Sequence, residues 1–176
     1  PSAAGEMPVP HFVDCFLRDA EDRAEEYDDR MGQGLFVPGD CRYAYQILVW
    51  LQHTKRTPLG ASFLEWGSGQ GMVTILAALL GYEATGVEID EGLVGEACGL
   101  AARYDAPARF AHGTYDPAKP GLKVFSARKR AVVYVYPWPG DEPLCLRLFA
   151  ESAEAGTLLL MCLGPEDIRM YCQKAR

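Results

Sequence analysis

Three glycines at alternate positions lie between a short apolar stretch and a longer amphipathic one. Residues 61–64 predict a buried strand, and residues 70–80 carry apolar side chains at the spacing of a helix. The turn between them contains Gly67, Gly69 and Gly71. Glycine tolerates positive φ and has no side chain that would hold a ligand away, so a polar ligand can reach the N–H groups at the start of the helix. The pattern predicts a nucleotide-binding loop.

The spacing of this loop, and the acid ahead of it, argue against a pyrophosphate ligand. The dinucleotide fingerprint is G-x-G-x-x-G, whereas this chain has G-x-G-x-G with Glu65 two residues before the first glycine. A carboxylate at that point repels pyrophosphate and suits an ammonium group. A nicotinamide-dependent oxidoreductase is therefore disfavoured.

A second acid lies at the end of the next predicted strand. Residues 84–90 form that strand, and Glu88 within it is 17 residues beyond Gly71. A carboxylate after the second strand of such a fold is suited to hydrogen bonds with a ribose diol. We therefore expect Glu88 to bind a ribose.

At these residues the sequence resembles the class I S-adenosylmethionine-dependent methyltransferases. Their first motif, acid-x-Gly-x-Gly-x-Gly, matches residues 65–71, and their acid-ended second strand matches residues 84–90. The resemblance spans roughly residues 36–163. It implies that S-adenosylmethionine is the cofactor and that its methyl group goes to an acceptor, a small molecule or a protein side chain, which the sequence does not identify. A catalytically silent domain that keeps this fold for cofactor or partner binding is the alternative.

The segment at residues 36–40 (Phe-Val-Pro-Gly-Asp) adds a short second match. It resembles the segment that opens the equivalent helix in several methyltransferase families, including some that modify protein lysines. A plain junction between a loop and a helix is the competing interpretation.

The resemblance assigns roles to individual residues of the cofactor site. Glu65 would receive the methionyl ammonium, Glu88 both ribose hydroxyls, and Ile89 would lie on the adenine face. Asp116 substitutes for the adenine-binding acid, which the family places slightly earlier. The implied cofactor-binding set is Glu65, Gly67, Ser68, Gly69, Gly71, Glu88, Ile89, Tyr115 and Asp116. If Glu65 and Glu88 were solvated loop carboxylates they would have no such role. Because Glu88 ends a strand, its removal is expected to change fold stability little.

Methyl transfer requires an aligned in-line displacement and exclusion of water, and it needs no obligatory base. Amine-modifying members place Asn or Asp-Pro-Pro-aromatic after the fourth strand, where this chain has Tyr-Pro-Trp-Pro at residues 136–139. The missing amide or carboxylate argues against methylation of a base or of glutamine. An aromatic floor suits a sulfonium or an alkylammonium through cation–π attraction. We predict Tyr136 and Trp138 as the catalytic residues; a rigid proline turn with a packed Trp138 is the alternative.

The order of elements predicts an α/β fold. We expect a three-layer, Rossmann-like methyltransferase sheet that is mostly parallel, with a C-terminal antiparallel edge strand and two N-terminal helices. The first helix, residues 11–30, should place Phe12, Cys15, Phe16 and Ala20 on one side. The other expected elements are helices at 40–55, 70–80, 91–104 and 141–155, and strands at 61–64, 84–90, 108–112, 131–136 and 157–163.

Two regions depart from the family plan. Residues 116–129 contain prolines and a glycine and predict a loop where a crossover helix is usual. Residues 168–173 predict a hairpin strand antiparallel to the fifth strand, which leaves one family strand missing. That strand would be an exposed sheet edge, through which the chain could form a homodimer.

Composition bounds the remaining expectations. The 176 residues predict a flexible lead-in at 1–10 and a single methyltransferase-like domain at 11–176. The six cysteines form no C-x-x-C pair, so we expect reduced thiols and no metal site. No apolar run reaches the ~20 residues of a membrane span, and no signal pattern opens the chain, which predicts a cytoplasmic protein without a membrane association.

The net charge of −7 is concentrated near the N-terminus. Residues 14–30 hold eight acids against three arginines, a net charge of −5. Such a surface repels phosphate backbones, so nucleic acid is not expected as a partner. Otherwise this acidic face is interpreted as a solvated helix surface.

Overall fold

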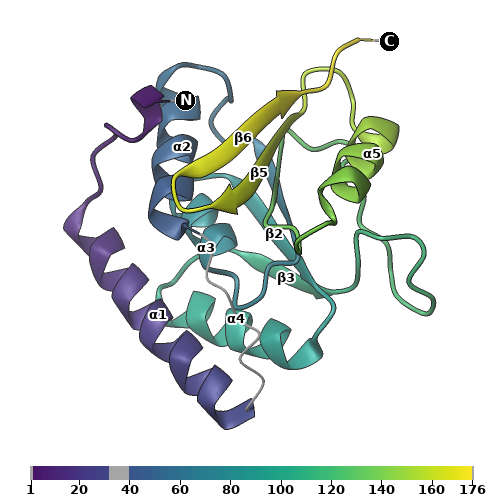
Figure 1. Cartoon of the computed structure of the whole chain (residues 1–176). Coiled ribbons are helices and arrows are strands. Elements are labelled where there is room, and N and C mark those ends of the chain that lie inside the picture. The colour runs from purple at the N-terminus through teal and green to yellow at the C-terminus, as the bar shows by residue number, and fades with distance from the viewer. Residues whose placement is uncertain (1, 32–39, 176) are drawn as a thin grey trace.

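A computed structural model describes residues 2–31 and 40–175 of the chain (Figure 1). Its helices are η1 (Ser2–Ala4), α1 (His11–Met31), α2 (Cys41–His53), α3 (Met72–Leu79), α4 (Glu91–Arg103) and α5 (Glu142–Ser152). Its strands are β1 (Ser62–Trp66), β2 (Glu83–Glu88), β3 (Arg109–His112), β4 (Val132–Val135), β5 (Leu158–Gly164) and β6 (Asp167–Cys172). Most of the segment at residues 36–40 falls outside the described residues.

The strands form one sheet in the order β3-β2-β1-β4-β5-β6. The first five run parallel, and β6 runs antiparallel to β5. This arrangement confirms the predicted mostly parallel sheet with a C-terminal antiparallel edge strand. Strand β1 lies in the middle, and its Glu65 is opposite Gly86 of β2 and Tyr134 of β4.

Each face of the sheet has its own core because successive strand side chains point to opposite faces. Phe63 and Tyr134 pack in a cluster with α1, α2, α3 and α4, whereas Leu64 and Val133 pack in a second cluster with α5. Figure 1 shows α5 on the side of the sheet away from α1 and α4. Residues 116–129 contain no helix, as predicted, and Ala127 from this loop is fully buried under the second face.

The buried side of α1 differs from the sequence prediction. Phe12 is 54% exposed and Cys15 is also exposed, so the expected side was half wrong. The buried stripe is instead Val13, Phe16, Leu17, Ala20 and Ala24, at helical spacing. Phe16 packs edge-on against Tyr104 with ring centres 4.9 Å apart, and the Tyr104 hydroxyl donates to Asp19. These contacts fix α1 against the end of α4.

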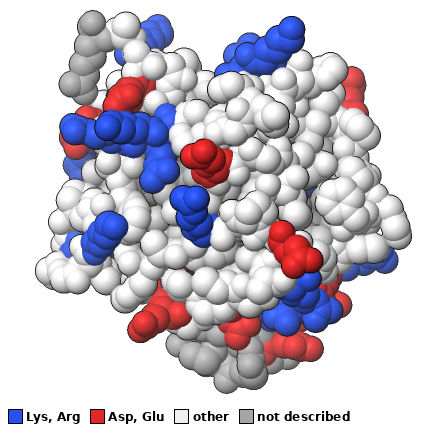
Figure 2. Space-filling view, turned by 180° about the vertical axis from the view of Figure 1, so that it is seen from behind, with Lys and Arg blue, Asp and Glu red and all other residues white. Residues whose placement is uncertain are grey.

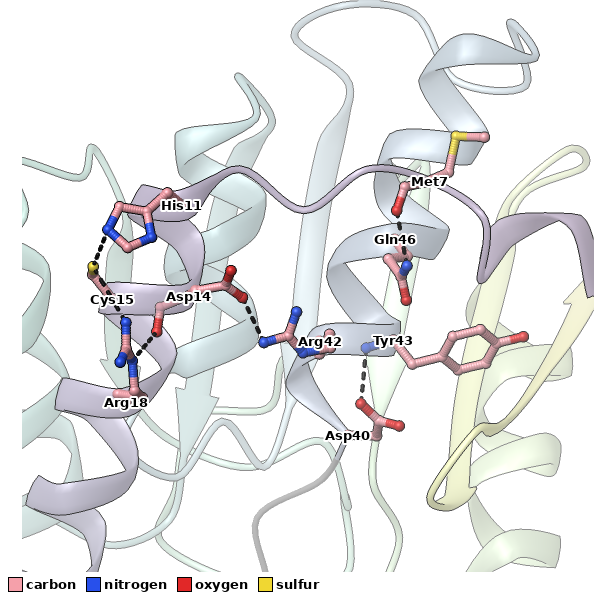
Figure 3. A network of polar contacts seen from close by, with 9 residues as sticks. All are labelled: Met7, His11, Asp14, Cys15, Arg18, Asp40, Arg42, Tyr43 and Gln46. Atoms are coloured by element: carbon pink, nitrogen blue, oxygen red, sulfur yellow. Dashed lines mark hydrogen bonds and ion pairs between the residues drawn. The ribbon is translucent and has the colours of Figure 1, made fainter.

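The N-terminal residues 2–10 pack on α2. Ala4 is fully buried, and the Gln46 amide donates to the carbonyl oxygens of Gly5 at 2.7 Å and Met7 at 2.8 Å (Figure 3 shows the Met7 contact). The expected lead-in therefore has tertiary contacts of its own, and its flexibility stays a prediction.

Strand β6 pairs with β5 on one side and, within residues 2–31 and 40–175, with no strand on the other. Homodimerisation through this edge stays a prediction. In the same residues no helix combines the length and the apolar character needed to cross a membrane.

Candidate functional site

The glycine loop between β1 and α3 has a backbone that side chains rarely adopt. Gly67, Gly69 and Gly71 have φ angles of 72°, 52° and 78°. The N–H groups of Gly67 and Ser68 both donate to the carbonyl oxygen of Val87 at 2.9 Å, which fastens the loop to β2. Helix α3 begins after Gly71, two residues later than predicted. All three glycines are therefore required by the backbone itself.

Packing requires glycine at two positions. A Cβ atom on Gly71 would lie 2.4 Å from the Phe110 ring, and one on Gly86 would lie 2.7 Å from the same ring. A Cβ atom on Gly67 would meet only Tyr115, at 4.0 Å. Sequence reasoning missed Gly86, although a glycine inside a strand is a known signal of close approach. Gly71 and Gly86 thus serve the fold, whereas the Gly67 position is open.

Glu65 lies inside β1 and is only 5% exposed. Its Oε2 atom accepts hydrogen bonds from the Thr74 N–H at 2.9 Å and from the Thr74 hydroxyl at 2.5 Å. The pKa of Glu65 is raised to about 8, chiefly by burial; the nearby Glu88 charge acts in the same direction, and the hydrogen bonds from Thr74 oppose the shift. Among the described residues, the other oxygen, Oε1, has no hydrogen-bond donor. Glu65 is therefore a buried carboxyl, not a solvated loop residue.

Glu88 ends β2 and is 8% exposed. Its Oε2 atom accepts from the Gly69 N–H at 2.8 Å, and its Oε1 atom accepts from the N–H groups of Ile89 at 2.7 Å and Asp90 at 3.0 Å. A carboxylate accepts about four hydrogen bonds, so roughly one place is left for a further donor. The neighbouring Ile89 side chain is half exposed. The binding of both ribose hydroxyls and the adenine contact stay predictions.

Tyr115 and Asp116 follow β3 beside the glycine loop. The Tyr115 ring stacks on Trp66, with ring centres 5.2 Å apart and planes at 18°. The Asp116 carboxylate accepts from the Ala118 N–H at 2.9 Å, and the Asp116 N–H donates to the Thr114 hydroxyl at 3.0 Å. Asp116 therefore stabilises a local turn, and an adenine contact from either residue stays a prediction.

A cavity of about 60 Å³, which we call the loop cavity, lies against the glycine loop. Of the predicted cofactor-binding set, it brings together Glu65, Gly67, Ser68 and Gly69. It holds only part of a nucleoside-sized ligand. Its lining is Cys41, Glu65, Gly67, Ser68, Gly69, Gln70, Met72, Val73, Tyr134 and Tyr136.

Three buried polar atoms in this lining have no hydrogen-bond partner in the part of the chain that the structure describes: Ser68 Oγ, Gln70 Nε2 and Tyr134 OH. Burial also raises the Tyr134 pKa well above its usual value. Unpaired buried polar groups are rare because each carries a desolvation cost, and they call for a ligand or water. Sequence reasoning missed Gln70 and Tyr134. The signal for Tyr134 was its register, since it lies directly opposite Glu65.

The two predicted catalytic aromatics differ in position. Tyr136 is half-buried and lines the loop cavity. Trp138 is 59% exposed, and its carbonyl oxygen accepts from the Asp141 N–H at 2.9 Å in the turn before α5. The structure thus brings Tyr136, but not Trp138, into the cavity lining.

A second and larger cavity, of about 580 Å³, lies between α1 and the start of α2; we call it the α1–α2 cavity. It is lined by Asp14, Leu17, Arg18, Glu21, Asp40, Cys41 and Arg42. Cys41 is common to both cavities. Asp40 caps α2, because its carboxylate accepts from the Tyr43 N–H at 2.8 Å (Figure 3).

No protein-family model matches the sequence, and no curated protein matches it. Solved structures do. An RNA methyltransferase from Salinibacter ruber in complex with S-adenosyl-L-homocysteine superimposes with a TM-score of 0.54 at 20% identity, over 65% of this chain and 72% of that one. An S-adenosylmethionine-dependent methyltransferase from Thiobacillus denitrificans, also bound to S-adenosyl-L-homocysteine, superimposes with a TM-score of 0.51 at 26% identity. The match covers 65% of this chain and 46% of that one. The CcbJ methyltransferase from Streptomyces caelestis superimposes with a TM-score of 0.53 at 25% identity, over 70% of this chain and 49% of that one.

The fold is that of the class I S-adenosylmethionine-dependent methyltransferases. The chain spans about half the length of two of these three structures. In open α/β folds, ligands bind beyond the carboxyl ends of the parallel strands. In this methyltransferase fold the glycine loop follows β1, Glu88 ends β2 and Tyr136 follows β4, so these three features lie at that edge of the sheet.

Proposed function

We propose that this chain is an S-adenosylmethionine-dependent methyltransferase with its cofactor site at the glycine loop. The observation that carries the proposal is the loop cavity, whose lining residues include a buried carboxyl and three side chains with unpartnered, buried polar atoms. A structural turn alone would not leave so many polar groups unsatisfied. Glu88, bonded to Gly69, holds the other side of the same loop.

The residues present fit this cofactor. Glu65 Oε1 would accept from its ammonium group, and Glu88 has room for a ribose hydroxyl. Ser68, Gln70 and Tyr134 would supply hydrogen bonds to the polar atoms of its amino-acid part. When bound, the cofactor supplies an activated methyl group on a sulfonium. Its affinity is supported by charge at Glu65 and by the main-chain N–H groups of the loop.

The chain's own contribution to the reaction would be alignment and exclusion of water. Tyr136 lines the cavity at the carboxyl end of β4, and Cys41 lines it from the start of α2. Half-buried aromatic and apolar walls at this point favour a cationic sulfonium and keep bulk water away. A dedicated base is not required. The catalytically silent alternative differs only in lacking an acceptor.

We propose that the acceptor is not a nucleic acid. One of the similar structures is described as an RNA methyltransferase, whereas this chain has a net charge of −7 and an acidic α1. On the face seen from behind, charged side chains form separate groups with wide uncharged areas between them (Figure 2). Binding to phosphate backbones usually depends on a continuous basic surface.

Calorimetry with S-adenosyl-L-homocysteine, with NAD as the control ligand, tests the cofactor. We expect S-adenosyl-L-homocysteine to bind and to raise the melting temperature, and NAD to do neither. Stabilisation by NAD alone would overturn the proposal. Formation of S-adenosyl-L-homocysteine from the methyl donor, in the presence of fractionated cell extract, then separates an enzyme from a silent domain.

A further inference from the structure

The α1–α2 cavity adjoins the cofactor site at a single side chain. Cys41, the first residue of α2, lines both cavities. A ligand in the α1–α2 cavity would therefore lie next to the loop cavity at Cys41. With a volume of about 580 Å³, this cavity falls in the range of small-molecule sites.

The two arginines that line this cavity are occupied by α1. The Arg42 Nη2 atom pairs with the Asp14 carboxylate at 2.5 Å, and in Figure 3 the Arg42 side chain crosses from α2 to α1. The Arg18 Nε atom donates to the Asp14 carbonyl oxygen at 3.3 Å, and its Nη2 atom donates to the Cys15 sulfur. Arg42 is thus ion-paired with Asp14, whereas Arg18 donates to two neighbours on its own helix.

The two other carboxylates that line the cavity lack an ion-pair partner among residues 2–31 and 40–175: Glu21 and Asp40. Asp40 is held in place by two backbone N–H groups, from Tyr43 at 2.8 Å and from Glu166 at 3.1 Å. Glu21, on α1, is exposed. A carboxylate held by backbone N–H groups at the start of α2 and an exposed carboxylate on α1 suit a small cation.

The electrostatic field at Cys41, where the two cavities meet, also favours a positive charge. Burial is the largest cause that raises the pKa of the Cys41 thiol, and the carboxylates of Glu65, Glu21 and Asp40 add to it. A positive charge is therefore favoured where the two cavities meet.

We propose that the α1–α2 cavity binds the methyl acceptor and that this acceptor is a small alkylammonium, recognised by Asp40 and Glu21. The inference rests on the proposed function. One proton leaves the ammonium nitrogen to water before transfer. The nitrogen lone pair then forms a bond to the methyl carbon, the carbon–sulfur bond breaks, and its electron pair stays on sulfur.

The test uses three probes of equal length: 1,5-diaminopentane, 1,5-pentanediol and glutarate. Ligand-observed NMR on the full chain, saturated with S-adenosyl-L-homocysteine, would measure the affinity of each. We expect the diamine to bind and the diol and dianion to bind much more weakly. Asp40→Asn and Glu21→Gln should each weaken diamine binding about threefold to tenfold. Glu25→Gln, an exposed acid on the same helix that does not line the cavity, is the matched control and should change it less than twofold.

The outcomes separate the two proposals. Asn at position 40 keeps the helix cap, and an unchanged affinity for S-adenosyl-L-homocysteine shows that each variant is folded. If that ligand binds the unaltered chain while glutarate binds as tightly as the diamine, the acceptor assignment is overturned and the cofactor assignment stands. The acceptor assignment is also overturned if the double variant Asp40→Asn, Glu21→Gln binds the diamine as tightly as the unaltered chain. If S-adenosyl-L-homocysteine itself fails to bind, the proposed function falls, and the acceptor assignment with it.

Discussion

The Oε2 atom of Glu88, at the end of β2, accepts a hydrogen bond from the N–H group of Gly69 in the glycine loop at 2.8 Å. The other oxygen of the same carboxylate accepts from Ile89 and Asp90. Glu88 therefore joins the loop to the turn that precedes α4, in addition to facing the predicted ribose. A residue with both tasks affects folding and binding together.

Glu88→Ala should lower the free energy of unfolding of the ligand-free protein by about 1–3 kcal/mol, because three backbone N–H groups lose their acceptor. This corrects the sequence-based expectation of little change in stability. Affinity for S-adenosyl-L-homocysteine should fall as well. Urea denaturation without ligand and calorimetry with it measure the two effects. Glu88→Gln keeps one acceptor oxygen and should lose less stability; equal loss in both variants would contradict this account.

Glu65 makes the stability of the empty protein depend on pH. Its pKa is raised from 4.5 to about 8 in the folded protein, so between these pH values the folded state keeps a proton that the unfolded state has released. The contribution of Glu65 to stability is thus present below about pH 4.5 and is lost as the pH rises toward 8, at about 1.4 kcal/mol per pH unit. Denaturation at several pH values should show this loss, and Glu65→Gln should remove it.

The same shift predicts that cofactor affinity rises with pH. An ammonium group pairs with the carboxylate, not with the protonated acid, so binding of S-adenosyl-L-homocysteine must release the Glu65 proton below pH 8. Calorimetry at pH 6.5 and 8 in buffers of different ionisation enthalpy measures that proton release. A pH-independent affinity, with no proton released, would mean that Glu65 does not meet the ammonium group.

Spacing along the chain was sufficient to predict the sheet and the glycine loop, because strand alternation and positive-φ glycines are local properties. It was insufficient where the outcome depends on packing between distant elements. Phe12 and Phe16 both fit a helical stripe, and only contact with Tyr104 decides that Phe16 is buried. Likewise, nothing in the local sequence marks Tyr134 as a site residue. Only the pairing of β4 with β1 places it opposite Glu65.

Gly71→Ala should destabilise the fold more than Gly67→Ala. Both positions have φ above 70°, where an alanine costs about 1–2 kcal/mol. Only the Gly71 variant adds a clash, with its Cβ 2.4 Å from the Phe110 ring. Melting temperatures without ligand measure the difference. Phe110→Leu should recover part of the loss in the Gly71 variant and none in the Gly67 variant; equal losses at both glycines would rule out the clash.

Tyr134→Phe separates a ligand-binding hydroxyl from a structural one. The Tyr134 hydroxyl is buried without a hydrogen-bond partner among the described residues, so its removal should leave the empty protein as stable as before, or more stable by about 1 kcal/mol. Affinity for S-adenosyl-L-homocysteine should nevertheless fall. Denaturation and calorimetry on the same samples provide both values. A loss of stability with unchanged affinity would show that the hydroxyl serves the fold.

Trp138→Ala should impair methyl transfer far more than cofactor binding. Trp138 is 59% exposed and does not line the loop cavity, so its removal takes no contact from the cofactor site that the structure shows. It follows Tyr136 by two residues in a turn restricted by prolines and closed by a hydrogen bond from Asp141, which holds the indole near the carboxyl end of β4. An exposed aromatic held in that place can contact an acceptor as it enters.

The measurement is the rate of S-adenosyl-L-homocysteine formation, compared with the calorimetric affinity for the same compound. Phe12→Ala, which removes an aromatic of similar exposure from α1, is the control. Equal turnover in the two variants would leave Trp138 as a surface residue of a proline turn, because a contact with the acceptor must change the rate.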